Sequence, residues 1–332
     1  MNKLPEVGSE TENAGHANQS FRFAQLSDPH LSDLSNAKLS QLCNKRILGY
    51  LSWLKKRRKT HQRWVLDLAA EKIHAMGLDH IVFTGDMTHI GLAGEFAQVT
   101  DWLDQQSSRF DISLVPGNHD LYVDSHWRDF FEHWLPYMQS DSTAPVTDLS
   151  PHRAERALNE LFPTLRIRSD VAIIGLSSAY AAPWFFATGK VHANQVHRLR
   201  KLLCSEQVKN RYKVLVLHHP PKDGIVRFRK SLLANQELVA CLQDHPVDLI
   251  LHGHNHKQNI AWLSSGSRTK TPIISTASCS STDQEHRRKA EFRVFEIKKE
   301  LQDWTLLTQS FVLNHQRNTF EPESPKTELI AE

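Results

Sequence analysis

The sequence predicts a mixed α/β fold. Short apolar runs alternate with longer segments of helical periodicity, which is the pattern of α/β proteins. Hydrophobic residues make up 40% of the 332 residues and charged residues 23%, as in a globular protein with an apolar core. Five of the seven apolar runs end directly in clusters of Asp, Asn or His. Because open α/β folds bind ligands at the carboxyl ends of their strands, we expect these clusters to form one composite polar site.

The seven apolar runs are expected to be strands, and three segments between them are expected to be amphipathic helices. In chain order the runs read FRFAQLSD, DHIVFTGD, DISLVPGNHD, VAIIGLSS, KVLVLHHPP, VDLILHGHNH and TPIISTAS. The helices are expected at Trp64–Met76, Ala93–Gln106 and Asn194–Cys204. Two further strands, Glu291–Ile297 and Trp304–Leu313, are expected to complete a second sheet.

One domain is expected over residues 21–313. Residues 1–20 are polar and lack periodicity, so they are expected to be a disordered lead-in. Residues 314–332 contain two prolines and little that could be buried, so a second disordered tail is expected there. No internal repeat or low-complexity linker separates the two tails.

Charge and cysteine usage exclude several classes of protein. The net charge of +3 is small for this length, so no specific nucleic-acid partner is expected. The four cysteines lie far apart and form no CxxC pair, which argues against a zinc ribbon, a redox motif or a disulfide framework. The chain starts without an apolar signal-like region and has no run of about 18 apolar residues. These features predict a cytoplasmic protein whose membrane contact, if any, is peripheral.

The first polar cluster is Asp28-Pro29-His30. Side chains at positions i and i+2 of an extended segment point the same way, so Asp28 and His30 can bind one ion. The alternative is an Asp-Pro turn followed by a surface histidine, since such tripeptides are common in turns.

The next two clusters add carboxylates, an amide and an imidazole. Asp86 follows a glycine at a strand end, and its two oxygens can bridge a metal pair; a helix N-cap is the alternative. In the sequence GNHD, Asn118 offers an amide oxygen as a ligand, and His119 offers an imidazole for proton transfer. Asp120 is then expected to orient or charge that imidazole.

Two histidine clusters follow later strands. His254 and His256 repeat the i, i+2 spacing of the first cluster. His218 and His219 are neighbours that point to opposite faces, and the spacing to the next proline favours His218 as the ligand. His219 and His252 are expected not to be ligands. Together the clusters offer a mixed oxygen and nitrogen set that suits Mn, Fe, Zn or Ni, in preference to Ca or Mg.

The order DPH, GD, GNHD, HHPP, GHNH closely resembles the calcineurin-like metallophosphoesterase superfamily. That family has DxH, GD, GNH followed by an acidic residue, a histidine-bearing strand end, and GHxH. The resemblance spans most of Phe21–His256, and Gly189–Leu199 is similar to the segment that precedes the histidine strand in bacterial members. It implies a four-layer αββα sandwich of two mixed β-sheets flanked by helices, with a dinuclear metal site at the carboxyl ends of the strands.

The resemblance also implies a role for each matching residue. A hydroxide held between two divalent or trivalent ions would attack phosphorus, His119 would protonate the leaving group, and Asp120 would tune His119. The implied ligands are Asp28, His30 and His256 for the first ion, Asn118, His218 and His254 for the second, and Asp86 as the bridge between both.

Residues 34–66, which we call the basic insert, lie between the first two clusters. The basic insert has no Asp or Glu but nine Lys or Arg, and Ile47, Leu51 and Leu54 share one helical face. Such a segment can lie on an anionic membrane surface, here through Lys45–Arg63. The alternative is that its apolar side packs on the domain and its charges are solvated.

Several substrates are compatible with these motifs. The similarity to bacterial cyclic-nucleotide phosphodiesterases favours a small soluble phosphodiester such as a cyclic nucleotide. The basic insert favours a lipid-linked substrate at the inner membrane face, as in the related UDP-2,3-diacylglucosamine pyrophosphatases. The aromatic run Ala182–Phe186 can line a pocket for a base or an acyl chain, or simply anchor a loop in the core. A non-catalytic binding scaffold is a remote third reading, because every ligand position and His119 are intact.

Overall fold

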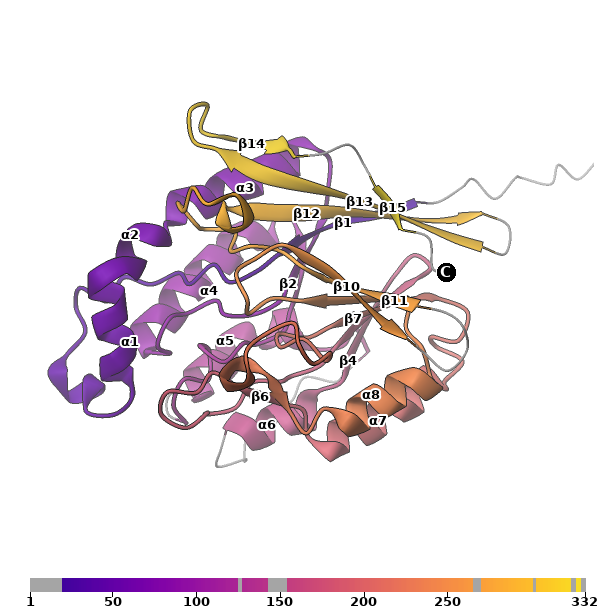
Figure 1. Cartoon of the computed structure of the whole chain (residues 1–332), viewed down its shortest axis with the longest axis horizontal. Helices are drawn as coiled ribbons and strands as arrows, with labels where there is room; N and C mark the ends of the chain where they lie inside the picture. Colours follow the sequence, from indigo (N-terminus) through magenta and orange to yellow (C-terminus); the bar gives the residue numbers. More distant parts are fainter. Residues whose placement is uncertain are drawn as a thin grey trace, which may run out of the picture.

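Two large mixed sheets lie between layers of helices in the computed structural model (Figure 1). The structure describes residues 20–124, 127–142, 154–264, 270–300, 303–323 and 327–329. The predicted sandwich of two mixed sheets flanked by helices is confirmed. The disordered lead-in expected for residues 1–20 lies outside the described residues, apart from Ser20, which begins the first strand.

The first sheet contains the strands that precede three of the polar clusters. β1, β2 and β3 are parallel neighbours, and β12 pairs with β1 in the antiparallel direction. The strand order is β14 (Thr319–Pro322), β13 (Asp303–Asn314), β12 (Glu291–Glu300), β1 (Ser20–Leu26), β2 (His80–Phe83) and β3 (Asp111–Leu114), with β15 (Thr327–Leu329) also pairing with β13.

The second sheet contains the strands that precede the two histidine clusters. β5, β7, β9 and β11 are parallel, and β4 and β10 are antiparallel edge strands. The order is β10 (Asn259–Ser264), β11 (Lys270–Ser275), β9 (Leu249–His252), β7 (Tyr212–Val216), β5 (Val171–Gly175) and β4 (Thr164–Arg168). The strands β6 (Gly189–Lys190) and β8 (Leu232–Leu233) form a separate two-stranded sheet.

Alternating side chains of the second sheet separate two apolar cores. Val214 and Val216 of β7 belong to the large core shared with the first sheet, while Leu215 and Leu217 belong to the core under α7 and α8. This alternation is the period of two that a strand buried on both faces requires. The helices are α3 (Arg63–Ala75), α4 (Ala93–Ser107), α5 (Trp127–Met138), α6 (Ala154–Leu161), α7 (Ala193–Leu203) and α8 (Gln236–Asp244).

The basic insert is a chain of short helical turns whose apolar side packs on the domain. Leu34, Leu42 and Trp53 are buried against Ile90 and Leu92, which follow the Asp86 cluster. The insert therefore forms a wall beside the strand ends. Its elements are η1 (Leu39–Leu42), α1 (Arg46–Ser52), the π-helical turn η2 (Trp53–Arg57) and α2 (Arg58–Thr60). None of the described helices is long and apolar enough to cross a membrane.

Two expectations about the C-terminal region are wrong. Glu291–Ile297 and Trp304–Leu313 extend the first sheet beside β1 and do not complete the second one. The segment after residue 314 contributes β14 and β15 to that same sheet, although disorder was expected there. Phe320 explains the order of β14: it is buried, and its ring lies 5.2 Å from that of Phe292.

Candidate metal centre

Four predicted ligands from three strand ends lie close together. A ligand atom of each of Asp28, His30, Asp86 and His256 lies within 4.8 Å of the others. His30 Nε2 is 3.1 Å from His256 Nε2, which is 3.3 Å from Asp28 Oδ1. The Nδ1 atom of His30 hydrogen-bonds to the carbonyl of Thr88 at 2.8 Å, so its Nε2 atom faces the cluster. This group of two carboxylates and two imidazoles is suited to a transition-metal ion.

The backbone is strained at these same positions. Asp28, His30, Asp86, His254 and His256 all have positive φ, between 43° and 72°. Among the described residues, they account for five of the nine non-glycine residues in that region, which L-amino acids rarely adopt. Strain of this kind persists only where the surrounding structure enforces it, and it is concentrated at functional sites.

The second predicted set also surrounds Asp86. His218 Nδ1 hydrogen-bonds to the carbonyl of Thr84 at 2.7 Å, and His218 Nε2 lies 3.2 Å from Asp86 Oδ2. Among the described residues, three buried atoms here have no hydrogen-bond partner: His218 Nε2, His254 Nε2 and Asn118 Oδ1. Buried polar atoms normally have partners, so three orphans in one cluster indicate a missing ligand. The residues present therefore fit a second metal ion.

The two adjacent histidines have different surroundings. His219 uses both ring nitrogens within the protein: Nδ1 lies 2.8 Å from Ser178 Oγ, and Nε2 lies 3.3 Å from the Ala187 carbonyl. His218 leaves Nε2 directed at Asp86. These contacts support His218 as the ligand. His219 instead holds the loop around Ala187 in place through its hydrogen bond to the Ala187 carbonyl.

Opposite charges are coupled across the cluster. Burial alone would raise the pKa of Asp86, but His218 and His119 hold that pKa well below its usual range. Burial likewise works against protonation of His218, yet the negative charge of Asp86 raises the pKa of His218 to about 9. The buried Asp86 carboxylate is therefore charged and must be balanced by nearby positive charge, which a metal cation would supply.

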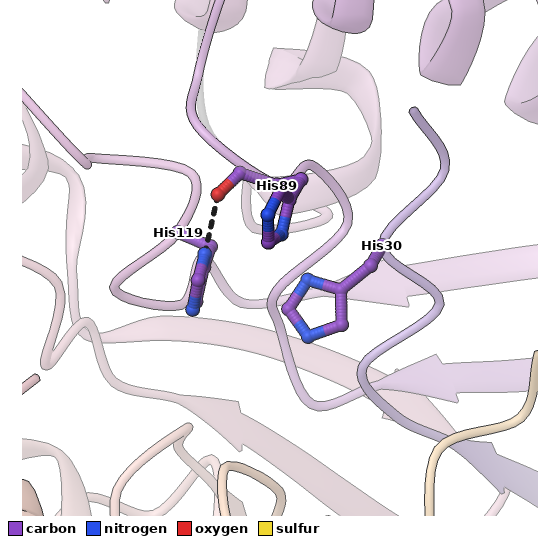
Figure 2. Close-up of side chains that lie close together, drawn as sticks. All are labelled: His30, His89 and His119. Carbon is purple, nitrogen blue, oxygen red and sulfur yellow. Dashed lines mark hydrogen bonds between the residues drawn. The ribbon is translucent and has the colours of Figure 1, made fainter. Parts of the chain in front are cut away.

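His119 is held by a backbone carbonyl. Its Nδ1 atom donates a hydrogen bond to the carbonyl of His89 at 2.5 Å, and the two rings stack with centroids 5.3 Å apart (Figure 2). The His30 ring lies 4.8 Å from the His119 ring. Because Nδ1 is engaged, Nε2 remains as the nitrogen for substrate. Burial lowers the pKa of His119 to about 4, although Asp86 opposes this.

The expected pairing of Asp120 with the His119 ring is wrong. Asp120 Oδ1 accepts hydrogen bonds from the backbone N–H and the hydroxyl of Thr88, and Oδ2 accepts one from Gly117 N–H at 2.8 Å. Asp120 thus joins the two loops that carry Asp86 and Asn118. Its carboxylate organises backbone, while the His89 carbonyl orients His119.

The structure adds residues that the motifs do not contain. His89 Nε2 hydrogen-bonds to the carbonyl of Gly49 at 3.1 Å, and Arg57 Nη1 lies 3.2 Å from His89 Nδ1 and 3.5 Å from His30 Nε2. The His61 ring lies 4.8 Å from that of His30. His89 follows Asp86 by only three residues, and this closeness in sequence could have indicated that His89 belongs to the site. Arg57 and His61 lie in the basic insert. No sequence pattern distinguishes these two residues, which face the site, from the neighbouring basic residues that face solvent.

Comparisons with known proteins agree with this architecture. A dimetal phosphatase from Danio rerio matches with 12% identity and a TM-score of 0.60, over 94% of this chain and 99% of that one. GAP50, the anchor in the inner membrane complex of Plasmodium, matches with 16% identity and a TM-score of 0.50, over 94% of this chain and 89% of that one. At these identities the likeness concerns the fold. The chain matches none of the curated proteins with which it was compared.

The family assignment comes from the sequence match. The family model for the calcineurin-like phosphoesterases matches residues 21–258, which include all the clusters described above. The chain therefore belongs to the calcineurin-like phosphoesterase family and is a metal-dependent phosphoester hydrolase.

Proposed function

We propose that the chain hydrolyses a phosphodiester or diphosphate bond at a dinuclear metal centre. The observation that carries this proposal is the set of three orphaned buried atoms around Asp86, beside the four-residue cluster. When bound, two ions would activate water and stabilise negative charge on the phosphoryl oxygens. The residues that would hold them are Asp28, His30 and His256 for one ion, Asn118, His218 and His254 for the other, and Asp86 between both.

His119 is proposed to protonate the leaving group. Its Nδ1 proton is committed to the His89 carbonyl, so only Nε2 can exchange a proton with substrate. At neutral pH burial keeps the imidazole uncharged, since its pKa is about 4. An anionic phosphoryl group beside the ring would raise that pKa by the coulombic effect that Asp86 already exerts. Substrate binding would thus favour the form that donates a proton.

One ester group is proposed to lie in a cavity beside His119, which we call the aromatic cavity. The aromatic cavity has a volume of about 230 Å³, and its lining includes His119, Asn118 and Arg57 together with apolar side chains. Lys45 donates a hydrogen bond to the Ala182 carbonyl at its rim and lies 4.8 Å from the centre of the Tyr122 ring. A nucleobase could stack there, as the cyclic-nucleotide reading requires. The apolar lining includes Leu48, Ala182, Pro183, Phe185, Phe186 and Ala187.

Exposed apolar groups favour a lipid-linked substrate as the second candidate. Phe185, which lines the aromatic cavity, is 72% exposed, its neighbour Trp184 is 49% exposed, and Leu51 of the basic insert is 44% exposed. Lys55 and Lys59 are exposed on the same insert. Exposed aromatic groups next to cations can contact an anionic membrane surface. In this reading the aromatic cavity receives the start of an acyl chain.

A substrate panel with added Mn tests the proposal. The substrates are bis-p-nitrophenyl phosphate, p-nitrophenyl phosphate, cyclic AMP and UDP-2,3-diacylglucosamine in detergent. Selective turnover of cyclic AMP supports the soluble phosphodiesterase, and selective cleavage of the lipid diphosphate supports the membrane enzyme. Preference for p-nitrophenyl phosphate over every diester would contradict the proposal, because it would make the chain a monoesterase.

Vesicle binding tests the membrane contact separately. Replacing Lys55, Arg58 and Lys59 with Gln should reduce co-sedimentation with phosphatidylglycerol vesicles, since each basic residue near an anionic surface contributes about 1 kcal/mol. A control that replaces Lys201, Lys209 and Lys222 removes the same charge from exposed positions elsewhere. Equal losses in both variants would rule out a specific contact through the basic insert.

A further inference from the structure

A second cavity lies on the other side of Arg57, and we call it the basic cavity. It has a volume of about 230 Å³, and its lining includes the proposed metal ligand His256. Four basic side chains and one carboxylate, that of Asp283, line it. Asp283 Oδ1 accepts a hydrogen bond from the backbone N–H of Glu285, so this carboxylate is already engaged. The four basic residues are Lys56, Arg57, Lys230 and Arg288.

In the described part of the chain, no carboxylate lies within ion-pair distance of Arg57. The hydrogen bonds of its guanidinium run from Nη1 to the imidazoles of His89 and His30. A cation this close to a buried site is usually paired with an anion, because leaving it unpaired costs free energy. His89 holds Arg57 in place, since its other nitrogen bonds to the Gly49 carbonyl. Asp86 and Asp28 act on Arg57 through their charge, but both are proposed metal ligands, so the guanidinium is prepositioned for a further anion.

Lys230 brings a second unpaired cation from a distant segment. It ends the short helix η3 (Phe228–Lys230), in the loop that follows the His218 cluster. No described carboxylate lies within ion-pair distance of its ammonium group. Arg288, by contrast, pairs with Glu285 at 3.2 Å, so it contributes less free charge. Arg57 and Lys230 therefore form the cationic part of the basic cavity.

The positions of the two cavities indicate which end of the substrate lies in which cavity. Arg57 lines both, the aromatic cavity also contains His119 and Asn118, and the basic cavity also contains His256. The proposed metal cluster thus lies between them. Since His119 is the proposed proton donor, the leaving group belongs on the side of the aromatic cavity. The substituent that stays on phosphorus then extends towards the basic cavity.

We propose that the basic cavity binds a second phosphate, attached to the scissile phosphoryl group, so that the substrate is a diester of diphosphate. The proposal rests on the proposed two-metal hydrolysis. Water adds to the scissile phosphorus, and the P–O bond to the ester group in the aromatic cavity breaks while the P–O–P bond stays intact. The leaving oxygen takes the proton from His119, and a proton from the attacking water restores His119. Arg57 and Lys230 hold the second phosphate throughout. A cyclic nucleotide has no second phosphate and would leave the basic cavity without an anion.

Kinetics of Lys230→Ala on two substrates test the proposal. UDP-glucose has a second phosphate, whereas bis-p-nitrophenyl phosphate has none. A charge-assisted hydrogen bond contributes about 1.5–3 kcal/mol, so kcat/KM for UDP-glucose should fall roughly 10- to 100-fold more than kcat/KM for bis-p-nitrophenyl phosphate. Lys230→Arg should restore most of the difference. Lys209→Ala, which removes an exposed lysine elsewhere, should leave both rates unchanged.

A binding measurement separates this proposal from the proposed function. Calorimetric titration of the Mn-loaded full-length chain with inorganic pyrophosphate should show weaker binding for Lys230→Ala than for wild type, while inorganic phosphate should bind both alike. Equal losses for both ligands and both substrates would overturn the second-phosphate site, and so would no loss at all. If wild type hydrolyses neither substrate, the proposed function fails, and the pyrophosphate titration alone decides the basic cavity.

Discussion

At the residue scale, the proposed hydrolysis depends on the identity of the site residues and equally on the hydrogen bonds that orient their side chains. The motifs placed the candidate ligands in one group, because spacing within a cluster and order along the chain are local properties, and four of the candidates do lie within 4.8 Å of one another. The motifs did not reveal that the His89 carbonyl orients His119 or that Asp120 accepts a hydrogen bond from Thr88 in the other loop. Those contacts link residues about 30 positions apart, and no sequence pattern encodes them.

Replacing His119 tests its role as proton donor. His119→Ala should keep the bound metal and lose about 10²- to 10⁴-fold in kcat with an alkyl ester, because an alkoxide leaves poorly without a proton. The loss with bis-p-nitrophenyl phosphate should be much smaller, since p-nitrophenolate needs no proton. His197→Ala, on the exposed face of α7, serves as the control. Equal losses with both esters would contradict the proton-donor role.

Because of the buried carboxyl group of Glu95, we expect the free energy of unfolding to depend on pH. Glu95 is buried and accepts hydrogen bonds from the backbone N–H groups of His89, Ile90 and Leu92, near Arg46. Burial raises its pKa from 4.5 to about 7. Between these values the folded chain binds more protons than the unfolded chain, so stability falls as pH rises through that window.

Glu95→Gln should remove this contribution. From pH 5 to pH 8, the free energy of unfolding of the variant should gain about 1–3 kcal/mol relative to wild type. Urea unfolding of both proteins at the two pH values measures the difference. If the two proteins change in parallel, Glu95 ionises normally in the folded state.

At the scale of elements, the basic insert is a wall of the site. Its basic composition indicated exposure, but its charges divide: Lys55 and Lys59 face solvent, while Arg57 reaches His89 and His30. Helical periodicity grouped Ile47, Leu51 and Leu54 on one face, but Leu51 is 44% exposed, whereas Trp53 is buried. It could not predict the π-helical turn Trp53–Arg57 that ends in Arg57. The bounds of the three expected helices agree with α3, α4 and α7 to within one residue, because their apolar periods are regular, whereas several expected strands end earlier or later than predicted.

Gly49 allows α1 to approach the catalytic loop. A Cβ atom there would lie 2.3 Å from Ile90 Cγ2 and 3.3 Å from the Tyr122 hydroxyl, so Gly49→Ala must push the insert outward. We expect a loss of about 1–3 kcal/mol in the free energy of unfolding and a lower kcat/KM, because Arg57 moves with the insert.

Gly94→Ala is the matched control for Gly49→Ala. A Cβ atom at Gly94 meets nothing within 4 Å, and this residue lies in α4. Alanine favours a helix over glycine, so this variant should be as stable as wild type or more stable. Thermal unfolding and turnover are measured on both variants. Equal effects would show that the close approach at Gly49 is unimportant.

At the scale of the whole molecule, the centre exists because five strand ends from two sheets converge. The order of the motifs predicted this convergence, since the carboxyl ends of parallel strands share an edge. The partners of the C-terminal strands were not predictable, because pairing between β12 and β1 joins segments more than 260 residues apart. Phe320 is likewise buried against Phe292 of the distant strand β12, a contact that the local sequence does not reveal.

Metal content tests the central claim, that Asp86 joins two metal sites in one centre. Wild type purified with Mn should contain two ions per chain by elemental analysis, and Asp101→Ala, which changes an exposed carboxylate on α4, should also contain two. Asp86→Ala should contain fewer than one ion, because both sites lose the shared carboxylate at once. Retention of two ions by a folded Asp86→Ala variant would contradict the account.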